Sequence, residues 1–234
     1  MSSLYAVTMD TGSGGKESID FHQQRHPYAG VSMTTKELQS QTDPVVQFVS
    51  WFEEAKALPS VTQPNAMALA TCTKEGRPSL RYVLMKHFDK DGIVFYTNYN
   101  SRKGSELTEN PNVAVVFYWE PLHRQVRVEG SVVRISREES ESYFKSRPYD
   151  SRLSASVSPQ SSVITEKRKL EEDKEKMKAL YPESLGGPPT PEHWGGFRIV
   201  PHSFEFWIGQ SNRLHDRFLF TKEKDSWRVD CLAP

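Results

Sequence analysis

The order of hydrophobic and polar residues predicts a polar N-terminal arm followed by one structured domain. Residues 1–40 are polar, include the Gly/Ser stretch "TGSGG" and show no periodicity, which is typical of a flexible arm. The first periodic segment starts at Asp43, a good N-cap, with Pro44 at the first helical position. The apolar residues of this helix share one face: Val45, Phe48, Val49, Phe52 and Ala55. We therefore expect a domain over residues 41–234 that begins with an amphipathic helix.

Short apolar runs then follow at close spacing and predict strands. They are "NAMALATCT", "PSLRYVLMK", "GIVFYTN", "NVAVVFYWE" and "RQVRVEGSVVRIS", and later "GGFRIVP", "SFEFWIG", "RFLFTK" and "WRVDCLAP". Helices are expected at "SRKGSELTENP", capped by Ser101, at "ESYFKSRP", after a capping box of Ser136 and Glu139, and at "TEKRKLEEDKEKMKALY". The short turns favour an antiparallel sheet or barrel shared by both strand groups, in an α+β fold with peripheral helices.

Composition narrows the class of protein. Thirty basic residues balance 30 acidic ones, so a general nucleic-acid binder, with its usual basic excess, is disfavoured. Two cysteines and seven histidines show no metal-ligand spacing, and we expect no metal. No run approaches the ~18 apolar residues of a membrane span, and the N-terminus lacks the pattern of a secretory signal. These features predict a cytoplasmic protein without a membrane partner.

The strongest candidate for phosphate binding lies at a junction between a strand and a helix. In "FYTNYNSRKGSEL", Thr97, Ser101, Arg102 and Lys103 come together where the helix begins. A helix N-terminus offers unpaired N–H groups and positive potential. Arg and Lys oppose the helix dipole there, so their placement makes sense if they meet a phosphate.

Two further sets of residues could bind anions. Tyr143 and Arg147 are four apart on a predicted helix, and Ser151 follows the break at Pro148; together they could hold a second phosphate. An ordinary helix-surface pair is the simpler interpretation of Tyr143 and Arg147 alone. Arg81 and Lys86, five apart, would lie on opposite faces of a regular strand unless the strand ends or bulges near Lys86.

The segment "QSNRLHDRFLF" combines charge with a strand-like pattern. As a strand, it would place Arg213, His215 and Arg217 on one face and Asp216 on the other. These three side chains, cationic or nearly so, repel one another unless an anion lies opposite them. We therefore favour an anionic ligand over a solvated face with ion pairs. Asp216 is expected to be a structural ion-pair partner.

The chain offers many cationic side chains and no evident nucleophile. No carboxylate pair, Ser–His–Asp or Cys–His arrangement stands out. This profile is typical of an enzyme whose chemistry belongs to a bound cofactor.

In a series of short motifs, the chain resembles the pyridoxine-5′-phosphate (pyridoxamine 5′-phosphate) oxidase family. The matching motifs run in order from about residue 25 to residue 234: "RYVLMK", "FYTNYNSRK", "FYWEPLHRQVRVEG", "YFKSRPYDS", "SPQSS", "WGGFRIVP", "FEFWIGQSNRLHDRF" and "CLAP". The resemblance implies an FMN-binding split barrel and a homodimer, with FMN in clefts lined by both subunits. It implies oxidation of pyridoxine 5′-phosphate or pyridoxamine 5′-phosphate to pyridoxal 5′-phosphate, by hydride transfer from C4′ to the flavin, with O2 giving H2O2 and the amine also releasing NH3.

The resemblance also implies site residues. For FMN they are Arg81, Tyr82, Val83, Leu84, Met85, Lys86, Tyr96, Thr97, Arg102, Lys103, Gln125, Gln160, Ser161, Trp207 and Arg217. For the substrate they are Lys86, Tyr143, Arg147 and Ser151 at its phosphate, Arg213, Leu214 and His215 at its ring, and Arg25 and Tyr28 in a possible lid. Arg213 and His215 are the expected catalytic residues.

Other functions on the same fold stay open from the residues. A flavin reductase or a non-catalytic carrier of FMN or pyridoxal phosphate would need the flavin site alone. The set Tyr143, Arg147, Ser151, Arg213 and His215 favours the oxidase, because a mere flavin binder would not need it.

Overall fold

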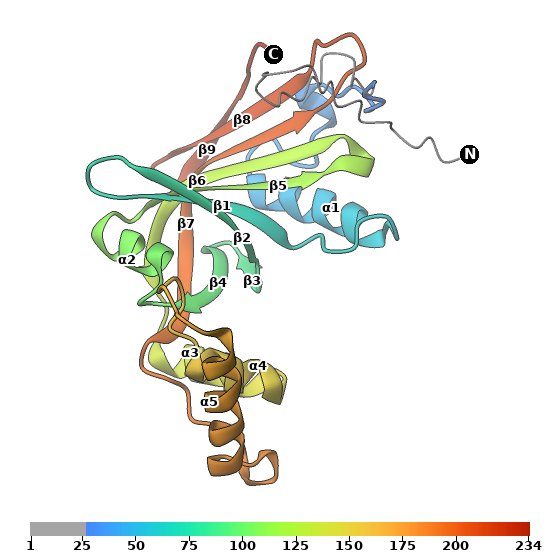
Figure 1. Cartoon of the computed structure of the whole chain (residues 1–234). Helices are drawn as coiled ribbons and strands as arrows, with labels where there is room; N and C mark the ends of the chain where they lie inside the picture. The colour runs from blue at the N-terminus through green and yellow to red at the C-terminus, as the bar shows by residue number, and fades with distance from the viewer. Residues whose placement is uncertain (1–26) are drawn as a thin grey trace, which may run out of the picture.

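The chain is organised around one antiparallel sheet, with α1 packed against it and α3, α4 and α5 beyond one end (Figure 1). The computed structural model describes residues 27–234, in which the strand order is β2-β1-β5-β6-β7-β4-β3, and β8 pairs with both β7 and β9. The strands are β1 Ala66–Cys72, β2 Pro78–Leu84, β3 His87–Asp89, β4 Gly92–Asn98, β5 Asn112–Trp119, β6 Arg124–Arg134, β7 Trp194–Ile208, β8 Asp216–Glu223 and β9 Ser226–Cys231. The two strand groups thus share one sheet, as predicted.

The long strand β7 divides the sheet into two branches. Along one edge it pairs with β6 for most of its length. Along the other edge, its first part pairs with β4 and its last part, Ser203–Ile208, pairs with β8. Strand β7 therefore belongs to two regions of the sheet, one with β4 and one with β8.

The prediction of two strands on either side of Pro201 was wrong, because β7 runs through it. The register shifts between Glu129 and Gly130 of β6, which pair with Ser203 and Pro201, so β7 carries one extra residue, His202, as a bulge beside Pro201. Gly130 is required there, since a Cβ would lie 2.3 Å from the carbonyl oxygen of Val200.

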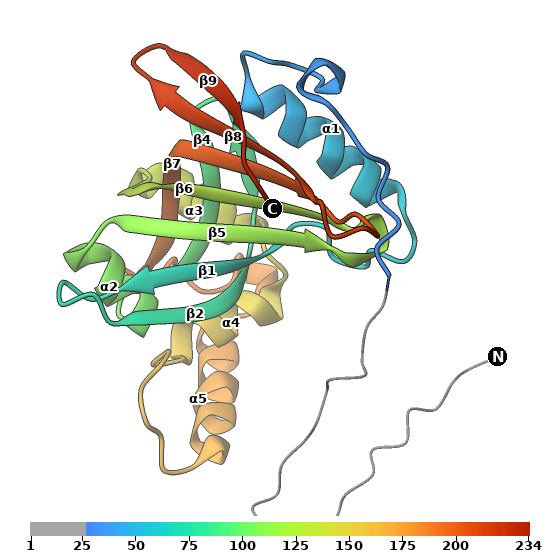
Figure 2. The same cartoon turned by 90° about the horizontal axis from the view of Figure 1, so that it is seen from above.

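Helix α1 (Pro44–Ala57) covers the interior face of the sheet (Figure 2). Phe48, Trp51 and Ala55 are buried, and the Trp51 ring meets Phe206 edge-on with centroids 5.2 Å apart. The predicted apolar face was partly wrong: Val49 is 45% exposed. The spacing of the buried residues explains the difference, because they recur every three or four positions and exclude Val49.

The remaining helices lie mainly beyond the end of the sheet where β7 begins (Figure 1). They are α2 Arg102–Glu109, α3 Arg137–Ser146, α4 Tyr149–Val157 and α5 Lys167–Leu180, with short 3-10 helices at Thr35–Glu37, Glu120–Leu122 and Glu183–Leu185. The predicted caps are confirmed: the side chains of Ser101 and Ser136 accept hydrogen bonds from backbone amides of α2 and α3. None of the helices within residues 27–234 is long and apolar enough to cross a membrane.

Candidate functional site

A cavity of about 730 Å³ lies between strands β2 and β4 and helices α3 and α4. It gathers most residues expected at either phosphate, although they come from distant parts of the chain. The predicted site residues that line it are Tyr82, Val83, Leu84, Lys86, Tyr96, Thr97, Lys103, Tyr143, Arg147, Ser151 and Gln160.

Lys86 reaches this cavity because its strand has already ended. Strand β2 stops at Leu84, so the alternation of side chains does not apply to Lys86. Its backbone N–H donates to the Val94 carbonyl at 2.8 Å, which turns the chain towards β3 and β4. Of the alternatives that the sequence left open, the strand end is the correct one.

Arg147 presents an unsatisfied cation in the cavity wall. It follows α3 as its C-cap, and its guanidinium lies 4.9 Å above the centre of the Trp194 ring. Among residues 27–234, Nη1 is buried without a hydrogen-bond partner, and burial lowers the pKa of this guanidinium. A buried donor without a partner is costly, so the site fits an anionic ligand.

Stacked aromatic rings form one side of the cavity. The Tyr96 and Tyr143 rings stack with centroids 4.0 Å apart, and Tyr96 also stacks on Trp194 at 5.3 Å. Tyr143 lies one helical turn before Arg147, as predicted, and both point into the same cavity. The two side chains line the same cavity, although α3 ends at Ser146 and Arg147 is already extended, so the predicted helical face stops one residue before Arg147.

Lys103 occupies the strand-to-helix junction predicted to bind phosphate. Its Nζ donates to Thr97 Oγ1 at 3.2 Å and to Gln160 Oε1 at 3.0 Å. Burial lowers the pKa of Lys103, and the charge of Arg81 lowers it further. The two cations therefore repel each other, which an added anion would relieve.

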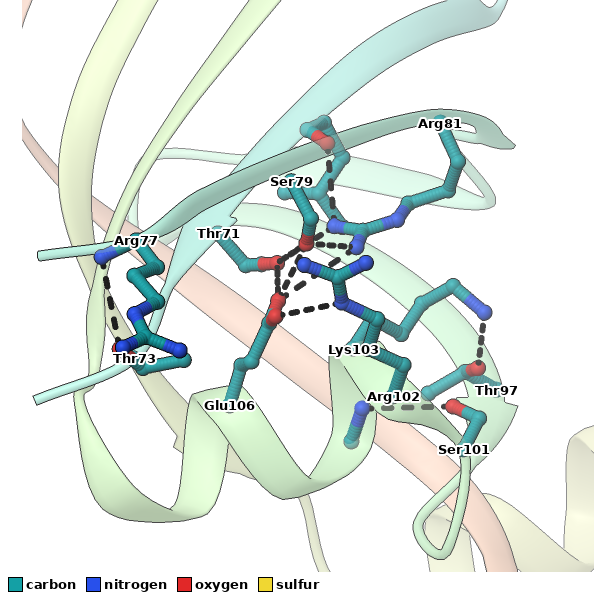
Figure 3. A network of polar contacts seen from close by, with 12 residues as sticks. Thr71, Thr73, Arg77, Ser79, Arg81, Thr97, Ser101, Arg102, Lys103 and Glu106 are labelled. Atoms are coloured by element: carbon teal, nitrogen blue, oxygen red, sulfur yellow. Dashed lines mark hydrogen bonds and ion pairs between the residues drawn. The ribbon is translucent and has the colours of Figure 1, made fainter. Parts of the chain in front are cut away.

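Arg81 and Arg102 lie beside this junction rather than in the lining of the cavity (Figure 3). Both approach the carboxylate of Glu106, Arg102 Nε at 2.9 Å and Arg81 Nη2 at 3.5 Å. Met85 packs in the hydrophobic core, whereas Ser161 is exposed next to Gln160. Three cations of the predicted flavin site, Arg81, Arg102 and Lys103, thus form one cluster, whereas Arg217 lies elsewhere.

A second group of site residues is assembled by the register of the sheet. Gln125 of β6 pairs with Trp207 of β7, and Trp207 pairs with Arg217 of β8. Directly opposite residues of neighbouring strands share a face, so the three side chains form one row. Arg217 is held there by its Nε, which donates to Glu205 at 2.8 Å.

Tyr28, His215 and Arg213 join this row at one end. The Tyr28 ring meets the Trp207 and His215 rings edge-on, with centroids 5.4 and 5.5 Å apart. The Arg213 guanidinium lies 5.6 Å from the centre of the Tyr28 ring. Gly209 makes this packing possible, because a Cβ would lie 2.7 Å from the Tyr28 ring.

The strand predicted through Arg213 and His215 was wrong, since β8 begins only at Asp216. Arg213 has φ of +68°, in the left-handed region that non-glycine residues rarely adopt. His215 Nδ1 accepts a hydrogen bond from the backbone N–H of Gln210 at 2.9 Å, which closes the loop. Leu214 is 65% exposed. A loop, and not strand alternation, therefore sets how Arg213 and His215 lie.

The two groups lie at opposite ends of β7. Trp194, the first residue of the 15-residue strand, borders the cavity, whereas Trp207 near its end belongs to the second group. At roughly 3.3 Å per strand residue, one chain does not bring both groups to one small ligand. Arg25, the other residue of the expected lid, lies outside the described residues.

Sequence reasoning missed several residues that support these groups. Trp194 and Glu205 stood inside the quoted motifs "WGGFRIVP" and "FEFWIGQSNRLHDRF", and Glu106 inside "FYTNYNSRKGSEL", but none of the three was given a role. Both carboxylates are buried and bind arginines of the expected flavin site. The sequence offered one signal for Glu106 and Glu205, a charged residue at an apolar position of a helix or strand. It did not show which arginine each carboxylate binds.

Comparison with known proteins identifies the family. Residues 53–181 match the family model described as pyridoxamine 5′-phosphate oxidase, and residues 194–234 match the pyridoxine 5′-phosphate oxidase C-terminal dimerisation region. Pyridoxine-5′-phosphate oxidase of Bos taurus is 49% identical over 206 residues, which cover 88% of this chain and 78% of the relative. The pyridoxine/pyridoxamine 5′-phosphate oxidase of Nostoc sp. is 49% identical over 199 residues, 85% of this chain and 92% of the relative.

Solved structures agree with this result. PhzG from Burkholderia lata, in complex with tetrahydrophenazine-1-carboxylic acid, superposes with a TM-score of 0.80 at 29% identity, covering 87% of this chain and 98% of PhzG. A pyridoxamine 5′-phosphate oxidase-related, FMN binding protein from Nostoc punctiforme has a TM-score of 0.63 at 17% identity, which shows the fold alone. The split-barrel prediction is confirmed, and the chain belongs to the pyridoxamine 5′-phosphate oxidase family, a family of flavin-binding proteins.

Proposed function

We propose that this protein oxidises pyridoxine 5′-phosphate and pyridoxamine 5′-phosphate to pyridoxal 5′-phosphate, with FMN as cofactor and O2 as electron acceptor. Relatives of this name are 49% identical to the chain over most of its length. The observation that carries the proposal is the cavity in which Lys86, Arg147 and Lys103 converge. Three cations around one cavity, one with a buried N–H that has no partner in the described part of the chain, suit ligands that carry phosphate.

The residues of the cavity divide between two phosphates. The substrate phosphate would be held by Lys86, Tyr143, Arg147 and Ser151, because Arg147 is positioned by Trp194 and has a donor without a partner among residues 27–234. Lys103 and Thr97, with Arg81 and Arg102 nearby, would hold the FMN phosphate. Binding the substrate at its phosphate, away from the reacting carbon, supplies energy that can orient that carbon.

The second group would hold the reacting rings. FMN, when bound, supplies the acceptor for the hydride from substrate C4′ and passes the electrons to O2, giving H2O2. Trp207, Gln125 and Arg217 form a row that can lie along the flavin. His215, whose Nδ1 already accepts a hydrogen bond, has Nε2 available for a ring substituent, and Arg213 adds a planar cation. These side chains orient the substrate; no separate nucleophile is needed.

The separation of the two groups implies a homodimer. One chain carries them at opposite ends of β7, so a complete site needs one group from each of two subunits. The match of residues 194–234 to a dimerisation region supports it. The sheet also exposes apolar side chains: Leu80 is 67% exposed, Tyr82 78% and Tyr118 50%. Tyr118 pairs with Gln125, so this apolar surface is continuous with the second group. A partner subunit on this face would complete each site.

An oxygen-consumption assay tests the reaction. The purified protein should carry flavin absorbance and should consume O2 and form peroxide with each phosphorylated vitamer. Unphosphorylated pyridoxine should react far more slowly at equal concentration, because it cannot use Arg147. Flavin binding without peroxide formation would instead identify a carrier or reductase and contradict the proposal.

A mixed dimer tests whether the site is shared. Subunits carrying Arg147→Ala and Arg213→Ala are coexpressed with different tags, and the heterodimer is isolated. If each site uses both chains, one of the two sites in the heterodimer is intact, and about half the wild-type activity returns. If each site is built within one chain, the heterodimer is no more active than either parent homodimer, which rejects the shared site.

A further inference from the structure

A carboxylate is buried beside the cations of the expected flavin-phosphate site (Figure 3). The Glu106 side chain is only 5% exposed and rises from α2 towards β1 and β2. It accepts hydrogen bonds from the hydroxyls of Thr71 and Ser79, the latter at 2.5 Å, and from Arg102 Nε at 2.9 Å. A buried charge is costly unless it is paired, and Glu106 has partners on both of its oxygens.

The same two hydroxyls connect Glu106 to Arg81. Arg81 Nη1 donates to Thr71 Oγ1 at 2.5 Å, and Nη2 donates to Ser79 Oγ. Each hydroxyl thus accepts from Arg81 and donates its own hydrogen to Glu106. The Arg81 guanidinium is thus held through its two terminal nitrogens, Nη1 and Nη2. Its Nε has no hydrogen bond to any residue within 27–234.

Glu106 also determines which part of Arg102 is free. The Arg102 side chain is 60% exposed, and only its Nε is bound by Glu106. Within the described residues, its two terminal nitrogens make no hydrogen bond. A guanidinium held at Nε presents its terminal N–H groups outward, in the fork that matches phosphate oxygens.

Repulsion among the neighbouring cations explains why the Glu106 carboxylate lies next to a site expected to bind phosphate. Arg81, Arg102 and Lys103 repel one another, and the charge of Arg81 contributes to lowering the pKa of Lys103. Burial alone would raise the pKa of Glu106, but hydrogen bonds from Ser79, Thr71 and Arg102 outweigh it and lower the pKa to about 2. Glu106 is therefore ionised at neutral pH, and the three cations still outnumber it.

We propose that Glu106 is a positioning residue that sets the preference of the flavin site for a phosphorylated flavin. It anchors Arg81 and Arg102 from the side away from the ligand, so that their remaining N–H groups meet the phosphate together with Lys103. This inference rests on the proposed function, because it assumes that the cluster binds FMN. It concerns the phosphate only, and the isoalloxazine ring is held elsewhere.

Titration of the flavin-free full-length chain with FMN and with riboflavin tests this role. Glu106→Gln keeps the shape of the side chain but removes its charge, and it should raise the Kd for FMN by about tenfold or more. The Kd for riboflavin should change less than about twofold, because riboflavin has no phosphate to be placed. Equal losses for both flavins would mark Glu106 as merely structural, and an unchanged Kd for FMN would also overturn the proposal.

Two further variants keep the test decisive. Glu109→Gln, on the exposed side of the same helix, should leave both affinities unchanged. If Glu106→Gln does not fold, Ser79→Ala removes one hydroxyl bridge and should lower FMN affinity selectively to a smaller extent. A wild-type chain that binds no flavin, or FMN no better than riboflavin, would defeat the proposed phosphate site itself. A wild-type preference for FMN that survives in the variants would defeat the role of Glu106 alone.

Discussion

The Asp216 carboxylate accepts a hydrogen bond from the backbone amide of Met33 at 3.0 Å, across 183 positions of sequence. The same oxygen accepts from Gln210 Nε2 at 2.8 Å. A neighbouring backbone bond, from Gly30 N to Gly209 O at 3.1 Å, holds the same two segments together. Asp216 was expected to be an ion-pair partner, but its hydrogen-bond partners within residues 27–234 are neutral. It ties the segment that carries Tyr28 to the loop that carries His215.

Asp216→Ala should loosen this connection. Charge-assisted hydrogen bonds contribute about 1.5–3 kcal/mol each, so Tyr28 and the His215 loop should lose their fixed arrangement. We expect KM for pyridoxine 5′-phosphate to rise about tenfold with a smaller change in FMN affinity. Hydrogen exchange of residues 28–33 should accelerate in parallel. Asp225→Ala, in the exposed turn between β8 and β9, is the matched control. Unchanged exchange in the Asp216 variant would contradict the anchoring role.

Arg213→Ala and His215→Ala should each lower kcat/KM for the phosphorylated vitamers. Both side chains lie beside Tyr28 in the second group, which is proposed to hold the reacting rings, and would contact the substrate itself. Steady-state kinetics with purified, flavin-loaded variants measure the effect. A loss below about threefold for both, less than ~1 kcal/mol, would reject their assigned roles.

Arg147→Ala should raise KM for phosphorylated substrates by about tenfold or more, because it removes a buried donor that no residue of the described chain, 27–234, satisfies. Arg147→Lys should restore only part of the affinity, since lysine has neither the planar fork nor the same stacking on Trp194. Arg168→Ala, on the exposed surface of α5, serves as control. Kinetics identical to wild type in Arg147→Ala would refute the substrate-phosphate assignment.

Leu80→Asp should weaken the homodimer. Leu80 is 67% exposed on β2, next to the residues expected to border FMN, and a buried charge in the interface would be unpaired. Sedimentation should find monomers at concentrations where the wild type is dimeric, and flavin should be lost at the same time. Val163→Asp introduces the same charge at a fully exposed loop position and should change neither property. A Leu80 variant that stays dimeric and retains flavin would argue against this interface.

The ionisation of Glu106 predicts a pH dependence of stability. Its pKa is lowered from 4.5 in an unperturbed chain to about 2 in the folded protein. The stabilisation is therefore complete above pH 4.5 and disappears as pH falls towards 2, with a magnitude on the order of 3 kcal/mol. Urea unfolding of the flavin-free chain between pH 6 and 2 should give a shallower slope for Glu106→Gln than for Glu109→Gln. Parallel curves for both variants would contradict the lowered pKa.

Part of the site could be predicted from the sequence because it depends on local geometry. The i, i+4 spacing predicted that Tyr143 and Arg147 lie near each other, and both line the cavity although α3 ends at Ser146; Ser101 caps α2 from within its own turn. Arg213 and His215 show the limit of this reasoning. Alternation assigned them to a strand, but the positive φ of Arg213 and the bond between Gln210 and His215 create a loop instead.

The sequence by itself determined the family, the cationic character of the sites and most of the elements, because motifs, charges and periodicity are local properties of the chain. Only the tertiary structure decided which residues meet. Sheet register places Gln125, Trp207 and Arg217 in one row, and burial brings Glu106 to Arg81. It also places the two groups of residues, proposed to bind phosphates and the reacting rings, at opposite ends of β7. Strand pairing and burial join residues that are far apart in sequence, and no local pattern records those partners.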